Sequence, residues 1–330
     1  MGHGAGGRMT QSLISRLFRW AFDNEALNKL DDMAVVPLDG SKLSVSTDSF
    51  VVDPIFFPGG DIGELAVYGT VNDVAMAGAR PVYLTAAFII EEGLPLTDLT
   101  RVVISMRDAA RRCDVTIITG DTKVVPKGKG DKLFITTTGI GVVTHPHTIS
   151  GSNLQPGDKI ILSGSIAEHG MAVLSKREGM RFEIPVESDA ANLHPLVCPL
   201  VRTFGAGIHA MRDATRGGVA AVLNEFAAGS KVGIRIQEQA IPILPAVASA
   251  CGMLGLDPLY VANEGKMLLS VAADRADQIL TMMRAHPLGK NAAIIGDVVA
   301  GSAGLVSMQT LLGSWRIVDV PLSEQLPRIC

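Results

Sequence analysis

Five aspartates stand out as candidate metal ligands: Asp48, Asp53, Asp73, Asp121 and Asp213. Four of them lie where a β-rich run meets a turn, and Asp73 lies inside an apolar run with helical character. Carboxylates that converge at strand ends suit hard divalent cations, which bridge oxygen ligands to phosphate groups. A structural role also fits some of them, since Asp53 precedes a proline and Asp213 fits the N-cap of a helix. Asp73 fits a structural role least, because a carboxylate among apolar neighbours needs a partner such as a metal ion.

Two glycine-containing segments offer backbone N–H groups that could bind phosphate oxygens. One is the start of the chain, with Gly6 and Gly7, and the other is Gly217-Gly218, where Arg216 adds a positive charge. Neither segment matches the Walker or the Rossmann glycine pattern, so those two modes of nucleotide binding are disfavoured. A loosely ordered terminus and a plain helix-initiating turn remain the alternatives.

Two further strings combine a carboxylate with a lysine. Lys123 follows Asp121 by two residues, and Glu264 precedes Lys266 just before a predicted strand. A buried or charge-paired glutamate can act as a general base, and a nearby lysine can tune it or stabilise developing negative charge. The alternative for each string is an ordinary surface ion pair.

The chain carries four cysteines, and Cys330 is its last residue. The other three lie in apolar or helical surroundings, form no CxxC pair, and fit core thiols rather than a zinc site or a disulfide framework. The preceding Pro327 stiffens the end, which carries one positive charge at Arg328 and one apolar side chain at Ile329. A thiol on such an end can enter a pocket and leave it again, although an incidental thiol on a frayed end is the alternative.

These residues must be positioned by α/β structure. Hydrophobic periodicity predicts helices at 11–21, 63–77, 167–178, 195–204, 218–228, 245–254 and 275–285, and one more that Thr97 caps. Alternating β-rich runs predict strands at 43–52, 82–90, 115–119, 132–143, 159–163, 232–236, 266–272 and 292–299.

A cluster of turn-forming residues at 150–158 is the best domain boundary. We therefore expect an N-terminal domain at 1–150, a C-terminal domain at 151–314 and a mobile tail at 315–330, in which Pro321 and Pro327 discourage regular structure.

Bulk composition limits the function classes. The chain has 330 residues, 47% hydrophobic and 19% charged, which suits two globular domains. A net charge of −4 and an aromatic content of 5% make nucleic acid a poor candidate partner. No apolar run is long enough for a membrane span and no signal-peptide core stands at the start, so we expect a cytoplasmic protein with no membrane contact.

Taken together, the motifs resemble the HypE family, the carbamoyl dehydratases of NiFe-hydrogenase maturation. The resemblance runs from residue 3 to residue 330, and its most specific part is the terminal PRIC. The motifs that carry it are HGAGG at 3–7, STDS at 46–49, DP at 53–54, FPGG at 57–60, NDVA at 72–75, EEGLP at 91–95, GDTKV at 120–124, DATRGG at 213–218, NEGK at 263–266, HPLG at 286–289 and PRIC at 327–330. Members of this family usually carry several residues before the first of these motifs, and here only Met1-Gly2 precede it.

The resemblance implies a fold of the PurM and selenophosphate synthetase type, with two α/β (α+β) domains. It also implies that the N-terminal domains pair in a homodimer and that ATP binds near this interface with Mg²⁺. The residues that it assigns to ATP binding are Gly6, Gly7, Asp48, Asp73, Asp121, Thr122, Asp213, Arg216 and Gly217, of which Asp48, Asp73 and Asp121 hold the metal.

The reaction that the resemblance implies is dehydration of a carbamoyl group on Cys330 to a thiocyanate. A HypF carbamoyltransferase loads the sulfur, the amide oxygen attacks the γ-phosphate of ATP, and the cyanide later passes to a HypC–HypD complex. Glu264 is then the proton acceptor and Lys123 assists it. Selenophosphate synthetase is the first alternative, but that enzyme uses a cysteine or selenocysteine near its N-terminus, and no cysteine precedes Cys113. A maturation scaffold without turnover is the second, and the clustered carboxylates argue against it.

Overall fold

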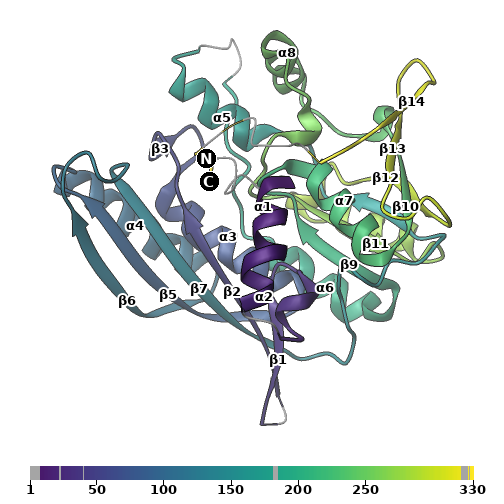
Figure 1. Ribbon diagram of the computed structural model, residues 1–330, viewed down its shortest axis with the longest axis horizontal. Helices are drawn as coiled ribbons and strands as arrows, with labels where there is room; N and C mark the ends of the chain where they lie inside the picture. The colour runs from purple at the N-terminus through teal and green to yellow at the C-terminus, as the bar shows by residue number, and fades with distance from the viewer. Residues whose placement is uncertain (1–7, 22–23, 40, 181–184, 321–325, 327) are drawn as a thin grey trace.

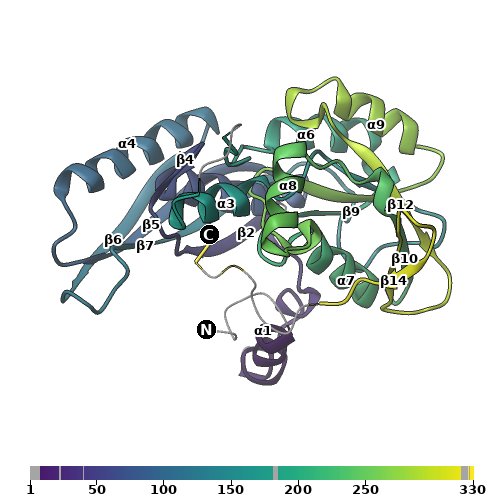
Figure 2. The same cartoon turned by 90° about the horizontal axis from the view of Figure 1, so that it is seen from above.

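The computed structural model describes residues 8–21, 24–39, 41–180, 185–320, 326 and 328–330. Two twisted β-sheets lie side by side, one formed by the first half of the chain and one by the second (Figure 1). Helices cover both sheets, and the C-terminus lies beside the first sheet, close to the junction of the two halves (Figures 1 and 2).

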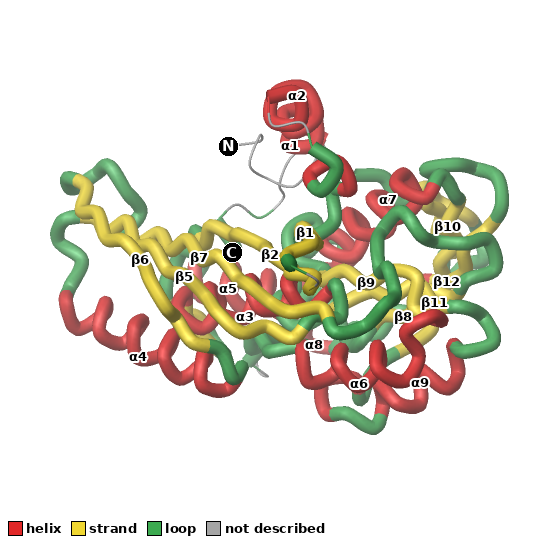
Figure 3. The backbone as a smooth tube through the Cα atoms, turned by 90° about the horizontal axis from the view of Figure 1, so that it is seen from below, coloured by secondary structure: helices red, strands yellow, loops and turns green. Residues whose placement is uncertain are grey.

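The first sheet has the strand order β1-β2-β7-β5-β6. Its strands are β1 (Ala34–Leu38), β2 (Ser41–Phe50), β5 (Arg80–Glu91), β6 (Thr116–Val125) and β7 (Leu133–Val143). All neighbouring strands are antiparallel except β5 and β6, which are parallel and are connected by helix α4 (Leu96–Arg112). Helices α3 (Ile62–Met76) and α4 pack on one face of this sheet and leave the other face open (Figure 3). A small hairpin of β3 (Phe56–Phe57) and β4 (Gly60–Asp61) precedes α3.

The second sheet has the strand order β14-β13-β10-β12-β8-β11-β9. Its strands are β8 (Lys159–Leu162), β9 (Ile208–Asp213), β10 (Gly233–Gln237), β11 (Met267–Val271), β12 (Ala293–Val299), β13 (Val306–Gln309) and β14 (Trp315–Ile317). Helix α7 (Gly218–Ser230) covers one face of this sheet, and α6 (His194–Phe204) and α9 (Ala276–Arg284) cover the other. Helices α5 (Glu168–Arg177) and α8 (Pro245–Leu254) pack together beside the first sheet's core.

The remaining helical segments are short. Residues 8–21 form one helical run with an internal π-helical turn: α1 (Arg8–Leu13), Ile14–Phe18 and α2 (Arg19–Ala21). Single 3₁₀ turns lie at Leu27–Lys29, Gly205–Gly207, Glu238–Ala240, Pro258–Tyr260 and Pro287–Gly289. Among the residues that the structure describes, no helix is long and apolar enough to cross a membrane.

Helix α3 is the structural centre of the molecule. All of its fifteen residues except Glu64 and Asp73 are buried, because α3 packs on β2, β5 and β7 and also contacts α6 and β9 of the second half. A helix buried all round needs apolar residues on every side, which explains why its sequence is mostly apolar and small residues around the whole helix. Asp61 caps its start by accepting hydrogen bonds from the N–H groups of Gly63 and Glu64. Asp73 is a half-buried carboxylate on this helix, and its Oδ2 atom accepts a hydrogen bond from Ser46 Oγ at 2.6 Å.

Most predicted elements are present, with bounds shifted by one to three residues. Sequence patterns did not predict strands β1, β3, β4, β9, β13 and β14, since each is short or contains few alternating residues. Thr97 is not the cap of α4, because this helix begins one residue earlier, after Pro95. The strand predicted at 115–119 continues to Val125, so Asp121 lies within β6 and not in a turn after it. The proposed domain limits stay a prediction, but β14 forms in sequence that we expected to be an irregular tail, because pairing with β13 satisfies its backbone.

Candidate active site

Four aspartates converge between the two halves of the chain. Asp32 precedes β1, Asp48 lies on β2, Asp73 on α3 and Asp213 at the end of β9. Asp32, Asp73 and Asp213 each bring one carboxylate oxygen to within 4.8 Å of the others, which is the spacing of ligands around one cation. Asp48 adjoins this set, accepts a hydrogen bond from Thr70 Oγ1 at 3.0 Å, and also interacts with Asp73.

Burial dominates the electrostatics of this cluster. It raises the pKa of Asp32 to about 7, with Arg212 opposing the change. Burial, followed by the charge of Asp48, raises the pKa of Asp73, and burial and then Asp32 raise that of Asp213. The pKa of Asp48 is raised by burial as well, although hydrogen bonds from Thr70 and Asp73 lower it. Carboxylates crowded in this way need cations to be ionised together.

Arg212 provides part of the compensating charge. Its Nε atom lies 2.5 Å from Asp32 Oδ1, and its Nη1 atom lies 3.0 Å from Glu225 Oε2. The opposite edge of Asp32 differs, because its Oδ2 atom is buried and has no hydrogen-bond partner among the described residues. An unpartnered buried carboxylate oxygen beside two other carboxylates fits a metal ligand.

Asp121, Thr122 and Lys123 are not brought to this cluster within one chain. Register across the sheet runs from Asp48 through β7 and β5 to Gly120, so Asp121 is three strand spacings, about 14 Å, from Asp48. The Asp121 carboxylate is exposed and bonds Lys123 Nζ at 3.0 Å and the Thr122 N–H at 2.8 Å. Across the sheet, Asp121 is in register with Thr136 of β7 and Ser49 of β2. The exposed hydroxyls of Ser49 and Thr136 lie 2.9 Å apart on the face that α3 and α4 leave open.

Glu264 lies in the same pocket as Asp48, Asp73 and Asp213 and is 3% exposed. Burial, and next the charge of Asp213, raises its pKa. Its Oε1 atom is buried without a hydrogen-bond partner in the described part of the chain. The side chain lines a small pocket, and the members of this pocket are Asp48, Ser49, Phe50, Gly69, Asp73, Asp213, Thr215, Arg216, Glu264 and Cys330.

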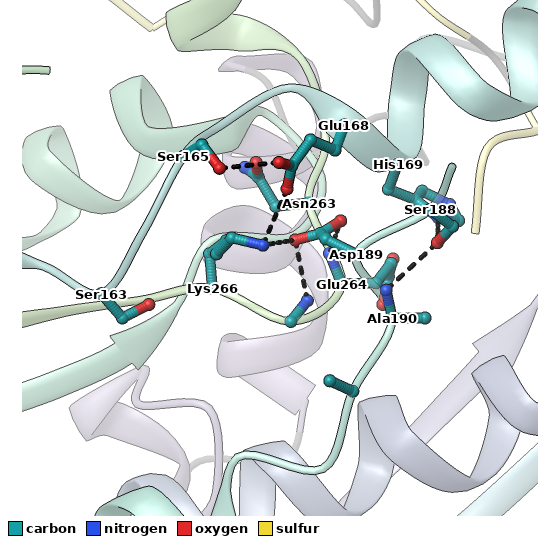
Figure 4. A network of polar contacts seen from close by, with 12 residues as sticks. Ser163, Ser165, Glu168, His169, Ser188, Asp189, Ala190, Asn263, Glu264 and Lys266 are labelled. Atoms are coloured by element: carbon teal, nitrogen blue, oxygen red, sulfur yellow. Dashed lines mark hydrogen bonds and ion pairs between the residues drawn. The ribbon is translucent and has the colours of Figure 1, made fainter. Parts of the chain in front are cut away.

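The backbone of Glu264 is held by two neighbours. Asp189 accepts hydrogen bonds from the N–H groups of Glu264 and Gly265 at 3.2 and 3.1 Å, and Asn72 Nδ2 donates to the Glu264 carbonyl at 3.2 Å. Gly265 is required here, because a Cβ atom at this position would lie 1.9 Å from the Asp189 carbonyl oxygen. Lys266 completes the network, with Nζ 2.9 Å from both Glu168 Oε2 and Asp189 Oδ2 (Figure 4).

The end of the chain docks against the segment that follows β2. The N–H of Val51 donates to the carbonyl of Cys330 at 3.0 Å, and the N–H of Asp53 donates to the carbonyl of Arg328 at 3.2 Å. Arg328 Nη1 lies 2.5 Å from Asp131 Oδ2, and its Nη2 lies 3.6 Å from Asp53 Oδ2. Ile329 is buried. Docking in this register brings Cys330 into the same pocket as Glu264.

The loop before α7 forms the remaining wall. Thr215 and Arg216 line the pocket, and Gly217 adopts a φ of +78°, a left-handed conformation that favours glycine. Helix α7 then begins at Gly218. Gly6 and Gly7 lie outside the described residues.

Several residues of this site carry little or no signal that sequence patterns could detect. Asp32 is adjacent to another aspartate just before a short strand, and Asp189 and His169 lie in segments with no motif that we could interpret. The pair Asp31-Asp32 just before β1 is the one sequence signal for Asp32, since acidic residues beside strand ends are candidate metal ligands.

Comparisons with known proteins agree with this geometry. Residues 30–143 match the family described as AIR synthase related protein, N-terminal domain, and residues 155–308 match its C-terminal domain. The carbamoyl dehydratase HypE of Cupriavidus necator is 54% identical over 331 residues, which covers 100% of this chain and 94% of the relative.

Two solved structures have the same fold. The HypE–HypF complex has a TM-score of 0.89 at 49% identity, covering 94% of this chain and 100% of that one. HypE in complex with ATP has a TM-score of 0.85 at 50% identity, covering 99% and 98% of the two chains. The predicted two-part α/β fold and the family resemblance are therefore confirmed, and the chain belongs to the HypE family of AIR synthase-related proteins.

Proposed function

We propose that this protein is an ATP-dependent carbamoyl dehydratase, which converts a thiocarbamate on Cys330 into a thiocyanate with release of ADP and phosphate. The observation that carries the proposal is that Cys330 lines the same small pocket as Glu264 and the carboxylates of Asp48, Asp73 and Asp213. The name of the Cupriavidus necator relative, carbamoyl dehydratase, supports it over the full length of the chain. The sequence identity to this relative favours carbamoyl dehydration over the reaction of selenophosphate synthetase. The cluster of acidic groups argues against a scaffold without turnover.

The acidic cluster fits bound Mg²⁺. Asp32, Asp73 and Asp213 have the required spacing, and Asp32 Oδ2 is a buried oxygen without a hydrogen-bond partner among the described residues. Asp48 would complete the ligand set, with Arg216 and the Gly217 turn beside it for phosphate oxygens. A HypE structure has been solved with ATP, which supports nucleotide binding at such a site. When bound, Mg²⁺ would supply charge neutralisation, and ATP would supply the phosphoryl group that turns the amide oxygen into a leaving group.

The chain's own residues account for the protons. Dehydration breaks the C–O bond of the carbamoyl group, whose oxygen leaves as part of phosphate, and it removes two N–H protons to leave S–C≡N. Glu264 is the acceptor of one of these protons, because it lines the pocket with Cys330 and its Oε1 atom has no hydrogen-bond partner among the described residues. The departing phosphate carries the other. Burial raises the pKa of Glu264, which makes its carboxylate a stronger base once ionised. The backbone bonds from Asp189 and Asn72 keep the glutamate in this position.

The docked end must leave the pocket to be loaded. A HypF-type carbamoyltransferase is the proposed loading partner, supported by the solved HypE–HypF complex. Transfer of the cyanide to a HypC–HypD complex is proposed from the resemblance alone. Both reactions fit a cytoplasmic enzyme whose Cys330 alternates between a docked and an exposed position.

A second copy of the chain is the proposed occupant of the open face of the first sheet. Tyr83 and Ile89 of β5 are exposed there, at 45% and 42%, which is high for large apolar side chains. Asp121 and Lys123 border the same face. In such a homodimer these two residues would meet the nucleotide from the partner's side, which would reconcile their predicted roles with their separation from Asp48.

Intact-protein mass spectrometry tests the proposal directly. The protein is incubated with a HypF-type carbamoyltransferase, carbamoyl phosphate, ATP and Mg²⁺, and the mass of the C-terminal peptide is followed. We expect first a carbamoyl group and then the mass of a cyano group in place of the thiol hydrogen on Cys330. The Cys330→Ser variant is the control and should gain neither. A carbamoylated Cys330 that persists unchanged with ATP and Mg²⁺ would refute the dehydratase reading.

A further inference from the structure

His169 contacts the docked end of the chain from the start of α5. Its imidazole is completely buried, and its Nε2 atom lies 2.7 Å from the carbonyl oxygen of Ile329. Its Nδ1 atom lies 2.8 Å from Ser188 Oγ (Figure 4). The Phe57 ring packs edge-on against the imidazole, with ring centroids 5.3 Å apart. The ring is therefore fixed on three sides.

The hydrogen-bond partners determine the tautomer. A backbone carbonyl only accepts hydrogen bonds, so Nε2 must carry the proton that it donates to Ile329. Ser188 Oγ accepts a hydrogen bond from the N–H of Ala190 at 3.1 Å, which leaves its hydroxyl proton for His169 Nδ1. Burial favours this neutral form further, because it lowers the pKa of His169. Every polar atom of the pair thus has a defined partner.

The bond from His169 fixes the peptide group that precedes Cys330. After Cys330, its own carbonyl oxygen accepts a hydrogen bond from the N–H of Val51. Two bonds that flank one residue set its register, because a shift by one position would turn its side chain away from the pocket. The loop that carries Ser188 continues directly into Asp189, which holds the backbone of Glu264. The thiol and the proposed base are therefore positioned from the same loop.

We propose that His169, oriented by Ser188, is a positioning residue that holds the docked chain end in the register where Cys330 faces Glu264. The catalytic part of this role rests on the proposed function, whereas the docking part does not. His169 contacts the peptide carbonyl before Cys330 and not the sulfur, so its contribution is the placement of the group that reacts.

Two assays on the full-length protein test this role. The variants are His169→Leu, which removes the donor, His169→Gln, whose amide N–H can replace Nε2–H, and Ser188→Ala, which removes the orienting hydroxyl. The first assay measures modification of Cys330 by a thiol reagent, read by peptide mass spectrometry because three other cysteines are present. The second measures single-turnover dehydration of enzyme carbamoylated beforehand at saturating ATP.

We expect Cys330 in His169→Leu to be modified about tenfold faster and dehydrated about tenfold more slowly, which matches the loss of one buried hydrogen bond. Ser188→Ala should change the rates of Cys330 modification and of dehydration in the same directions but by smaller factors. His169→Gln should restore both rates to nearly the parent values. ATP affinity should be the same in all variants, since the aspartate cluster is untouched.

Two outcomes would overturn the proposal. One is a His169→Leu enzyme that matches the parent in both assays. The other is a His169→Gln enzyme as impaired as His169→Leu, which would mean that ring packing and not the hydrogen bond matters. If the parent fails to dehydrate carbamoylated Cys330 while His169→Leu still accelerates modification, the dehydratase function fails and the docking role stands.

Discussion

The Asp189 carboxylate accepts a hydrogen bond from the backbone N–H of Glu264 at 3.2 Å, and this links the proposed base to a buried ion pair. Burial alone would raise the pKa of Asp189, but the ammonium group of Lys266, 2.9 Å away, lowers it. The Lys266 and Asp189 side chains are 11% and 2% exposed, so neither charge is compensated by water. The ion pair therefore holds the strand end that presents Glu264.

Removing the charge of Lys266 should destabilise the protein severely. In Lys266→Met two buried carboxylates lose their cation, and breaking a buried pair in this way typically costs about 3–5 kcal/mol of unfolding free energy. Arg111→Met is the matched control, because the Arg111 side chain is 72% exposed beside Asp108. Chemical denaturation should give an unchanged midpoint for the control. Equal midpoints for both variants would mean that the Lys266 network contributes no stability.

Asp73→Asn should weaken ATP binding only when Mg²⁺ is present. The substitution keeps the shape of the side chain but removes a charge that a cation requires, and we expect at least a roughly tenfold loss of affinity. Titration calorimetry measures the ATP affinity of the parent and the variant, once with Mg²⁺ and once with a chelator. Asp277→Asn on α9 serves as the control for a change of charge away from the site. Affinities in Asp73→Asn that equal those of the parent, both with Mg²⁺ and with the chelator, would remove this residue from the metal site.

Glu264→Gln should bind ATP normally and lose the chemical step. Proton transfer by a positioned base typically contributes roughly 10²–10⁴ in rate, so thiocyanate formation should fall by that factor. The amide cannot accept the N–H proton, although it fills the same volume. Quench-flow analysis of carbamoylated enzyme gives the rate, and a parent-like value would require the base to be another residue.

Arg328→Ala should loosen the docked chain end modestly. The Arg328 side chain is 38% exposed and pairs with Asp131 and Asp53, and ion pairs this accessible contribute little because water screens them. We expect modification of Cys330 to accelerate by about two- to fivefold. Asp131→Ala should give a similar increase, and the double variant should add almost nothing beyond either one. Additive effects would show that Arg328 and Asp131 act separately.

Docking of the chain end should weaken in acid through His169. Burial lowers its pKa in the docked state, whereas the exposed imidazole keeps its ordinary value of about 6.5. The undocked state therefore binds more protons, so docking is strongest above pH about 6.5 and is lost as the pH falls below this value. The hydrogen bond to the Ile329 carbonyl, and then the charge of Asp189, oppose this shift of the His169 pKa, but burial outweighs both.

The pH effect can be measured as a ratio. Cys330 modification in the parent is divided by that in His169→Gln at each pH from about 5.5 to 8, which cancels the ionisation of the thiol itself. The ratio should rise as the pH falls. A constant ratio across this range would show that protonation of His169 is not linked to docking.

The sequence alone determined the parts of the protein whose signals are local. Hydrophobic periodicity located most helices and strands, because burial of one face repeats with the period of the element. Asp73 could be singled out because its apolar neighbours placed a carboxylate in the core, and Cys330 because of its place in a terminal motif. The motifs together identified the HypE family, which the full-length identity to relatives confirms.

Only the tertiary structure decided which of these residues meet. Asp32 joins Asp73 and Asp213 although 41 and then 140 positions separate them in sequence. Asp121 lies within a motif, yet two intervening strands separate it from this cluster in the same chain. The contacts of Asp189 and His169 with Glu264 and Ile329 depend on the packing of α5 and its loop on both halves of the chain. No local pattern encodes these distances, because sheet register and packing between domains set them through contacts far apart in sequence.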